Sequence, residues 1–270
     1  MRCGPLGRRR VVGLWLLFSF SGSSFVWAGH ISIQSQVDVS TRKNTLDVAV
    51  TVTNHGDESA RNVQIKAEAP AFSRESAVQS TLPVGKSDSA TFHFPISRLS
   101  PGRYPLIVRI LYTDANLYPF SALTVSSFAR QQDIPAGLIG ILEGTVLRDK
   151  GRLTLKLKNL EDESRPLHIR LITPHELSAD PSSLETVLAP HQEASYNFSL
   201  ANFSALSGSS YPVYGLIEYD RTGVHNTAEA MGIVRISDSK LTANNTWLIL
   251  LGILAVLFAF INVRAFRKSR

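Results

Sequence analysis

The chain has 270 residues, with 28 lysines and arginines against 22 aspartates and glutamates, so its net charge is +6. Eight of the cations lie at the two ends, and residues 29–263 carry 20 cations and 22 anions, a net charge of −2. A near-neutral body excludes nucleic acid as its partner. The only cysteine, Cys3, lies in the first segment. We therefore expect the mature protein to have neither a disulfide nor thiol chemistry, which favours a bacterial origin for an exported protein.

Residues 1–28 have the pattern of a secretory signal peptide. Four arginines come first, the apolar run 11–20 follows, and the segment ends Val26-Trp27-Ala28. Small residues at the last and third-last positions fit cleavage after Ala28, and the apolar run is too short to cross a bilayer as a mature helix. The sequence therefore predicts export of the remaining chain.

Residues 29–128 are predicted to form a first β-sandwich. Apolar residues alternate with polar ones along two neighbouring segments, as in half-buried antiparallel strands. The inward positions are Leu46, Val48, Val50 and Val52, then Val63, Ile65 and Ala67. A short polar connection, 55–58, joins the two segments, and alternation returns at 90–94 and 104–112. About 100 residues is the usual size of such a domain.

Residues 129–136 are predicted to be a linker, and residues 137–236 a second sandwich. Alternation stops at Ala129 and resumes after Pro135, whose ring disfavours helix in the residue before it. The second domain repeats the pattern with Leu153, Leu155 and Leu157, then Leu167, Ile169 and Leu171. Because the linker is short, we expect a restricted range of interdomain angles.

The remaining residues predict a membrane anchor. A polar linker, 237–246, precedes the uncharged segment 247–263, which is long enough to span most of the hydrocarbon core. Trp247 fits one membrane interface. The basic tail 264–270 fits the cytoplasmic side under the positive-inside rule, through Arg264, Arg267, Lys268 and Arg270. We expect a single-pass protein of the cytoplasmic membrane whose two domains lie in the periplasm or outside the cell.

The two domains are related by an internal repeat. LDVAVTVTNHGDESARNVQIKAEAP, residues 46–70, returns as LTLKLKNLEDESRPLHIRLITP, residues 153–174. Phe92 and Phe94 return as Tyr196 and Phe198, and Gly102 with Tyr104-Pro105 returns as Gly208 with Tyr211-Pro212. These motifs resemble the bacterial Ig-like sandwiches called CARDB, cell-adhesion-related domains, and the similar modules attached to some glycosidases. The resemblance implies a role in contact, spacing or assembly, and it carries over no catalytic residue.

Side chains that could bind metal or act in catalysis are sparse and scattered. The sequence has no nucleophile elbow, no phosphate-binding glycine loop and no His-Glu-x-x-His motif. Two pairs of adjacent carboxylates, Asp57-Glu58 and Asp162-Glu163, could supply some of the ligands of a calcium ion. They are better interpreted as solvated turn residues, because calcium needs six to eight oxygens. We therefore expect no catalytic residue, no cofactor and no metal.

Four tyrosines at matched places in the two copies could instead form binding surfaces. Exposed aromatic faces would suit a sugar or a protein. Their repetition favours a structural role, in the core or at the strand corner that ties a tyrosine to nearby backbone. The four are Tyr104, Tyr112, Tyr211 and Tyr219.

We predict an all-β protein, two tandem Ig-like sandwiches followed by one transmembrane helix, that acts as an interaction or scaffold module for envelope proteins. A periplasmic chaperone is an alternative, since pilus-assembly chaperones are also two Ig-like sandwiches, although Arg130 is only a weak candidate for the cation that grips a terminal carboxylate. A carbohydrate-binding accessory subunit also stays open, with a glycan as the ligand. So does a eukaryotic secretory-pathway protein, if the glycosylation triplets at Asn197, Asn202 and Asn244 are used.

Overall fold

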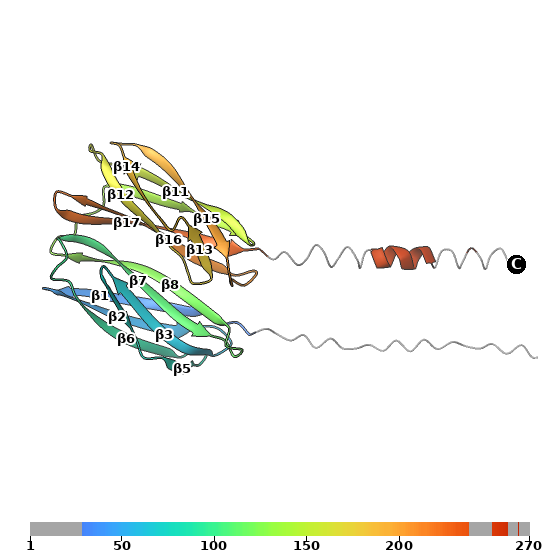
Figure 1. The fold of residues 1–270 in the computed structure, drawn as a ribbon. Coiled ribbons are helices and arrows are strands. Elements are labelled where there is room, and N and C mark those ends of the chain that lie inside the picture. Colours follow the sequence, from blue (N-terminus) through green and yellow to red (C-terminus); the bar gives the residue numbers. More distant parts are fainter. Residues whose placement is uncertain (1–28, 238–249, 259–263, 265–270) are drawn as a thin grey trace, which may run out of the picture.

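The computed structural model describes residues 29–237, 250–258 and 264. Residues 29–237 form two β-sandwiches that lie side by side (Figure 1). The predicted cleavage site at Ala28, and Trp247, Arg267, Lys268, Arg270 and Asn244, lie outside the described residues.

The first sandwich has one sheet of three strands facing a second, larger sheet. The first sheet has the order β1 (Ile33–Arg42), β2 (Thr45–Asn54), β6 (Ser87–Pro95). In the second, β3 (Ala60–Ala69) pairs with β7 (Gly102–Thr113), β7 pairs with β8 (Pro119–Arg130), and the short β4 (Phe72–Glu75) and β5 (Gln79–Leu82) both pair with β3. The predicted inward residues of β2 and β3 are buried in one core between the sheets.

The second sandwich repeats this plan with one more strand on the smaller sheet. One sheet has the order β13 (Leu177–Asp180), β15 (Glu193–Asn202), β11 (Lys150–Asn159), β9 (Leu138–Glu143). The other has the order β14 (Ser183–Leu188), β12 (Arg165–Ile172), β16 (Ser210–Arg221), β17 (Val224–Ile236), and β10 (Thr145–Leu147) pairs with β17. Leaving aside the short β10 and the edge strand β14, the first, second, fourth and fifth strands (β9, β11, β13, β15) face the third, sixth and seventh (β12, β16, β17). This is the immunoglobulin arrangement. The predicted all-β sandwich fold is confirmed.

Strand register confirms that the sequence repeat is a structural repeat. Leu46 lies opposite Phe94 in the first domain, and Leu153 lies opposite Phe198 in the second. All four side chains are fully buried. The same pair of contacts therefore closes both cores, as the matched positions of the two motifs predict.

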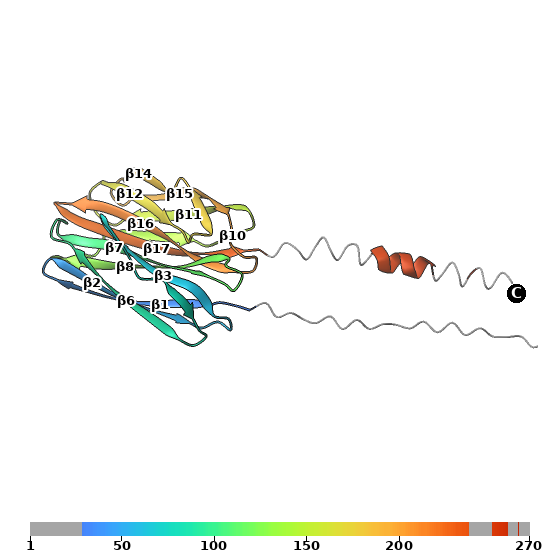
Figure 2. The same ribbon diagram turned by 60° about the horizontal axis from the view of Figure 1, so that its bottom comes forward.

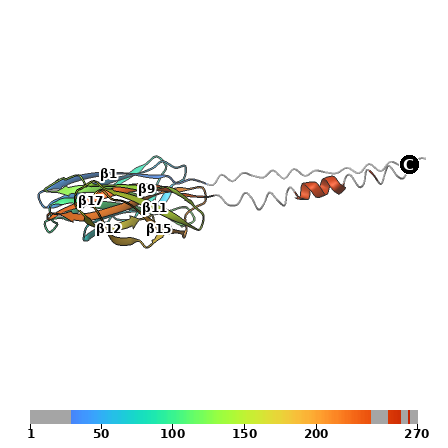
Figure 3. The ribbon, with the colours of Figure 1, turned by 90° about the horizontal axis from the view of Figure 1, so that it is seen from above.

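The two domains run in opposite directions. The start of the first domain and the end of the second therefore lie at the same end of the body (Figure 3). β8 ends at Arg130 and β9 begins at Leu138, at the end of the body away from Gly29 and Ser237 (Figure 1). A short connection suffices there because the two strand ends lie close together. The termini of the body share the opposite end, where Gly29 lies near residues 206–212 and the Gly208 N–H donates to the Ile236 carbonyl.

Residues 250–258 are helical and Arg264 is helical and exposed. Among the described residues, no helix has the length and apolar character needed to cross a bilayer.

Candidate interdomain groove

The two sandwiches are held together by the outer faces of their larger sheets. Strands β7 and β8 of the first domain lie beside β16 and β17 of the second (Figure 2). A small apolar cluster joins β7 and β8 to β12 and β16. Its buried members are Ile107, Leu123, Ile172 and Leu216. Because it is separate from both domain cores, it fixes the relative position of the domains by burial of apolar surface.

One set of polar contacts, which we call a polar seam, joins the two domains at the end of the interface where β7 begins. The His225 N–H donates to the Pro101 carbonyl at 2.8 Å, and the His225 ring stacks on Tyr104 with centroids 4.3 Å apart. The Thr227 hydroxyl donates to the Arg103 carbonyl at 3.0 Å. Gly102 and His225 also pair as a parallel β-bridge, so β7 and β17 join the larger sheets of the two domains into one 10-stranded sheet.

Gly102 is the residue that allows this approach. Its φ is +139°, and a Cβ built on it would overlap the backbone of His225. We expect Gly102→Ala to force the domains apart at this seam and to lower the thermal midpoint of the full chain in mild detergent. The matched control is Gly85→Ala, where φ is +70° but no atom lies within 4 Å. Equal destabilisation by both substitutions would mean that backbone strain, and not domain contact, decides the effect.

His225 also makes this seam sensitive to pH. Its Nδ1 lies 2.9 Å from Asp220 Oδ1 and its Nε2 lies 3.5 Å from Glu218 Oε1. Burial lowers the pKa of His225, but the carboxylates of Glu218 and Asp220 outweigh burial and leave the pKa raised above 6.5. A raised pKa in the folded state means that the protonated ring stabilises the fold.

This stabilisation is complete below about pH 6.5 and is lost as the pH rises through the higher folded value. We expect the thermal midpoint of the full chain to fall over that window, and His225→Gln to remove that part of the fall. A parallel series with His93→Gln, an exposed ring paired with Asp47, controls for ordinary surface histidines. Identical pH profiles for the wild type and His225→Gln would contradict the assignment.

A second polar seam lies at the other end of the interface, around a buried carboxylate. Glu176, in the turn after β12, is only 1% exposed. Its two oxygens accept hydrogen bonds from the Ser121 N–H and the Ser121 hydroxyl, both at 2.6 Å. The Ser121 oxygen accepts in turn from the His175 N–H at 2.9 Å. Because Ser121 lies on the edge strand β8, Glu176 satisfies a backbone N–H that no strand pairs.

Beside this seam is a groove of about 1150 Å³ between the two domains. One wall is formed by residues 31–35 of the first domain, a second by residues 120–124 of β8, and a third by residues 206–212 of the second domain. Aromatic rings lie on one side, where Tyr112 stacks on Phe120 at 5.7 Å and Tyr118 packs against Phe120 at 5.2 Å.

The groove offers apolar, aromatic and polar contacts, and its lining includes the carboxylates of Glu58, Asp114 and Glu176 but no lysine or arginine. Burial and the nearby charge of Glu176 raise the pKa of Tyr112, and burial raises the pKa of Tyr211. Both phenols are therefore protonated at neutral pH. Glu176 lines the groove, but both of its oxygens are already engaged by Ser121. This set of groups suits binding of a polypeptide or another polar ligand without a net negative charge.

The tyrosines singled out from the sequence have structural roles. The Tyr104 hydroxyl donates to the Ser100 carbonyl at 2.9 Å, and the Tyr211 oxygen accepts from the Leu206 N–H at 3.2 Å. These are the strand-corner bonds that their repeated positions predict. Tyr219 instead accepts from the Gly137 N–H at 2.7 Å, which ties the end of the linker to β16. Tyr112 and Tyr211 also line the groove.

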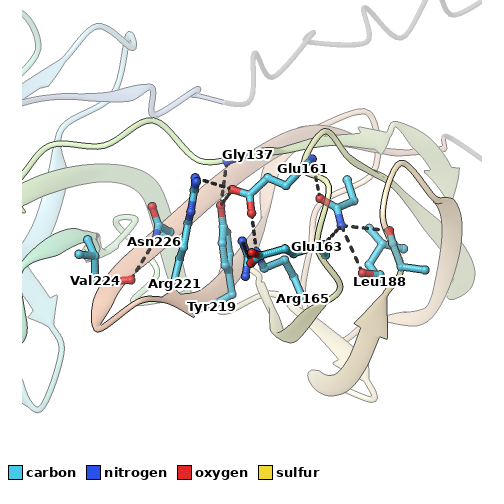
Figure 4. A network of polar contacts seen from close by, with 11 residues as sticks. Gly137, Glu161, Glu163, Arg165, Leu188, Tyr219, Arg221, Val224 and Asn226 are labelled. Carbon is cyan, nitrogen blue, oxygen red and sulfur yellow. Dashed lines mark hydrogen bonds and ion pairs between the residues drawn. The ribbon is translucent and has the colours of Figure 1, made fainter.

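A network of charges fixes the end of the linker on the second domain (Figure 4). Arg165 binds Glu161, and its Nη2 lies 2.7 Å from Glu163. Arg221 approaches Glu161 at 3.2 Å. Of the paired carboxylates Asp162-Glu163, Glu163 therefore holds Arg165, whereas Asp162 lies 2.9 Å from His191 Nε2. In the first copy, Asp57 accepts from the His30 N–H at 2.5 Å.

Other predicted residues lie away from the groove or are engaged elsewhere. Arg130 is buried, and its Nη2 donates to the Ser97 carbonyl at 3.1 Å, so it does not offer a cation to the interdomain surface. Asn202 donates to the carbonyls of Arg148 and Ala205, which occupies the amide that glycosylation would need. Asn197 is exposed on β15.

Comparisons with known proteins add little. No protein-family model and no curated protein matches the chain. Among solved structures, native Escherichia coli alpha-2-macroglobulin is 13% identical with a TM-score of 0.31, over 76% of this chain and 17% of that protein. Salmonella alpha-2-macroglobulin reacted with methylamine gives 16% and 0.30, over 76% and 16%, and red sea bream transglutaminase gives 15% and 0.25, over 73% and 31%. This chain spans less than a third of each, and likeness at these scores carries no argument; the fold assignment rests on strand order.

Proposed function

We propose that the chain is a single-span envelope protein that holds a partner protein in the interdomain groove, without catalytic activity. The observation that carries this proposal is the groove itself, formed by two domains whose contacts are apolar at the centre and hydrogen-bonded at both ends. A ligand therefore meets preorganised walls, which lowers the entropic cost of binding. The resemblance of the repeat to cell-adhesion-related domains supports a role in contact or assembly.

The membrane anchor is part of the same proposal. The large apolar side chains of the helical stretch 250–258 are at least half exposed, which is costly for an unanchored protein in water. The stretch lies inside the uncharged segment 247–263, before a basic tail. An apolar surface on all sides of a helix is typical of a membrane span.

Site-specific photo-crosslinking tests the groove. A photoreactive amino acid at Gln34, an exposed groove residue of β1, is expected to capture defined envelope proteins from native membranes. The same group at Ser40, which lies on the same strand about 20 Å away, is the matched control. Equal capture at both positions would refute the groove as the binding site. Capture of many unfolded exported chains at Gln34 would favour the chaperone function.

A further inference from the structure

Four apolar side chains stand exposed at the end of the body from which residues 29 and 237 lead away. Leu117 and Tyr118 belong to the β7–β8 loop, and Phe203 and Leu206 follow β15 in the other domain. Their exposed fractions are 64%, 39%, 74% and 46%. The Tyr118 hydroxyl donates to the Ser204 carbonyl at 3.0 Å, so the two loops are joined. We call these four side chains the tip patch.

Both loops of the tip patch are built to hold these side chains outward. Asp114 accepts from the backbone N–H groups of Asn116 and Tyr118, both at 2.8 Å, and this turn places Leu117 at a φ of +64°. A leucine in the left-handed region is unfavourable, so exposure there is not a default of the chain. In the second loop, Asn202 closes a ring of hydrogen bonds with Ala205.

The chain that leaves this end keeps the tip patch close to a bilayer. Ser237 is the last described residue of the body, and nine residues, 238–246, separate it from Trp247 at the start of the proposed span. Nine residues reach at most about 30 Å when fully extended. This step rests on the membrane anchor of the proposed function.

The composition of the tip patch fits the bilayer interface. Aromatic rings and leucines partition into the boundary between headgroups and acyl chains, where a tyrosine hydroxyl can remain hydrated. Charges of both signs lie near the tip patch. Asp114 and Glu58, which accepts from the Ala115 N–H, lie at the first loop, and Arg148, Asp149 and Lys150 lie beside the end of β15 at the second. Attraction to anionic lipid is therefore a minor contribution, and insertion of the apolar groups is the major one.

We propose that the tip patch docks into the headgroup region of the membrane that anchors the chain. Two contacts with the bilayer, the anchor and the tip patch, then fix the orientation of the body. The groove, which shares Tyr118 and Leu206 with the tip patch, opens next to the membrane surface. A partner held there is presented at a defined height above the bilayer.

Fluorescence of the full chain in vesicles tests this proposal, because Cys3 is the only cysteine and is replaceable by serine. An environment-sensitive dye on Phe203→Cys in phosphatidylcholine vesicles is expected to show blue-shifted emission and quenching by lipids with a nitroxide near the headgroup. The matched control is Arg98→Cys, an exposed position at the opposite end of the first domain. Adding Leu117→Asp should reduce the quenching at position 203 without lowering the thermal midpoint, since Leu117 is exposed and aspartate tolerates the left-handed region better than leucine.

Quenching at position 203 no stronger than at position 98 would overturn the proposal. Flotation of the protein with vesicles after alkaline carbonate treatment reports the anchor independently of the dye. Retained flotation without quenching therefore refutes only the docking. Loss of flotation refutes the anchor, and the docking with it.

Discussion

Replacing Glu176 by alanine is expected to lower the free energy of unfolding by about 3–5 kcal/mol. The substitution removes both acceptors of Ser121, one of them for a backbone N–H on an edge strand. Hydrogen bonds to a charged acceptor contribute about 1.5–3 kcal/mol each, and the donors left behind are buried. Chemical unfolding of the full chain in mild detergent, followed by circular dichroism, measures the loss.

Two controls separate this effect from loss of a surface charge. Glu185→Ala on β14 removes an exposed carboxylate and should change stability by less than about 0.5 kcal/mol. A double-mutant cycle between Glu176→Gln and Ser121→Ala isolates the coupling of the two side chains. Additive effects in the cycle, or equal effects of Glu176→Ala and Glu185→Ala, would contradict a stabilising contact between the domains at Glu176 and Ser121.

The domain cores were predictable because their signal is local. Alternation along β2 and β11 assigns each residue to a face without knowledge of the rest of the chain. The repeat then shows the same pattern a second time, so the inward position of Phe94 supports that of Phe198. The tyrosine corners follow from the same repetition, since a feature present in both copies serves the fold that both share.

The interface between the domains was not predicted because its contacts join distant residues of unlike character. Glu176 and Ser121 are 55 positions apart, and a glutamate in a turn is normally predicted to be exposed to solvent. Two signals were present in the sequence. The apolar run Leu106-Ile107-Val108 breaks the alternation of β7, as in a strand buried on both faces. Glu176 also stands where the repeat has Phe72, so the copies differ where the domains meet.

The groove follows from the same packing and therefore also lay beyond the sequence. Its walls come from β1, β8 and the loop before β16, which no local pattern connects. The opposite directions of the two domains, which place residues 29 and 237 at one end, depend on the short connection after Arg130 and on the close approach at Gly102. A longer linker or a bulkier residue at that position would remove the geometry without altering either domain core.

Changing Asn54 or Asn159 to aspartate is expected to cost about 3–5 kcal/mol in each case, because both amides close the same turn in the two copies. Asn54 donates to the carbonyls of Glu58 at 2.7 Å and Leu82 at 3.1 Å and accepts from the Gly56 N–H. Asn159 donates to those of Glu163 at 2.8 Å and of Leu188 and Ala189, and accepts from the Glu161 N–H.

Both side chains are fully buried, so an aspartate would face these carbonyl oxygens with a carboxylate in place of the donor group. Loss of two donors and exposure of buried acceptors to a charge account for the size of the effect. Asn116→Asp, in an exposed turn, makes the same atomic change in water and should be nearly neutral. Because each asparagine joins its turn to the strands of its own domain, hydrogen exchange should report faster opening in that domain first. Equal opening of both domains in either variant would mean that the two sandwiches unfold as one unit, and that the interface, and not the turn, sets the stability of the pair.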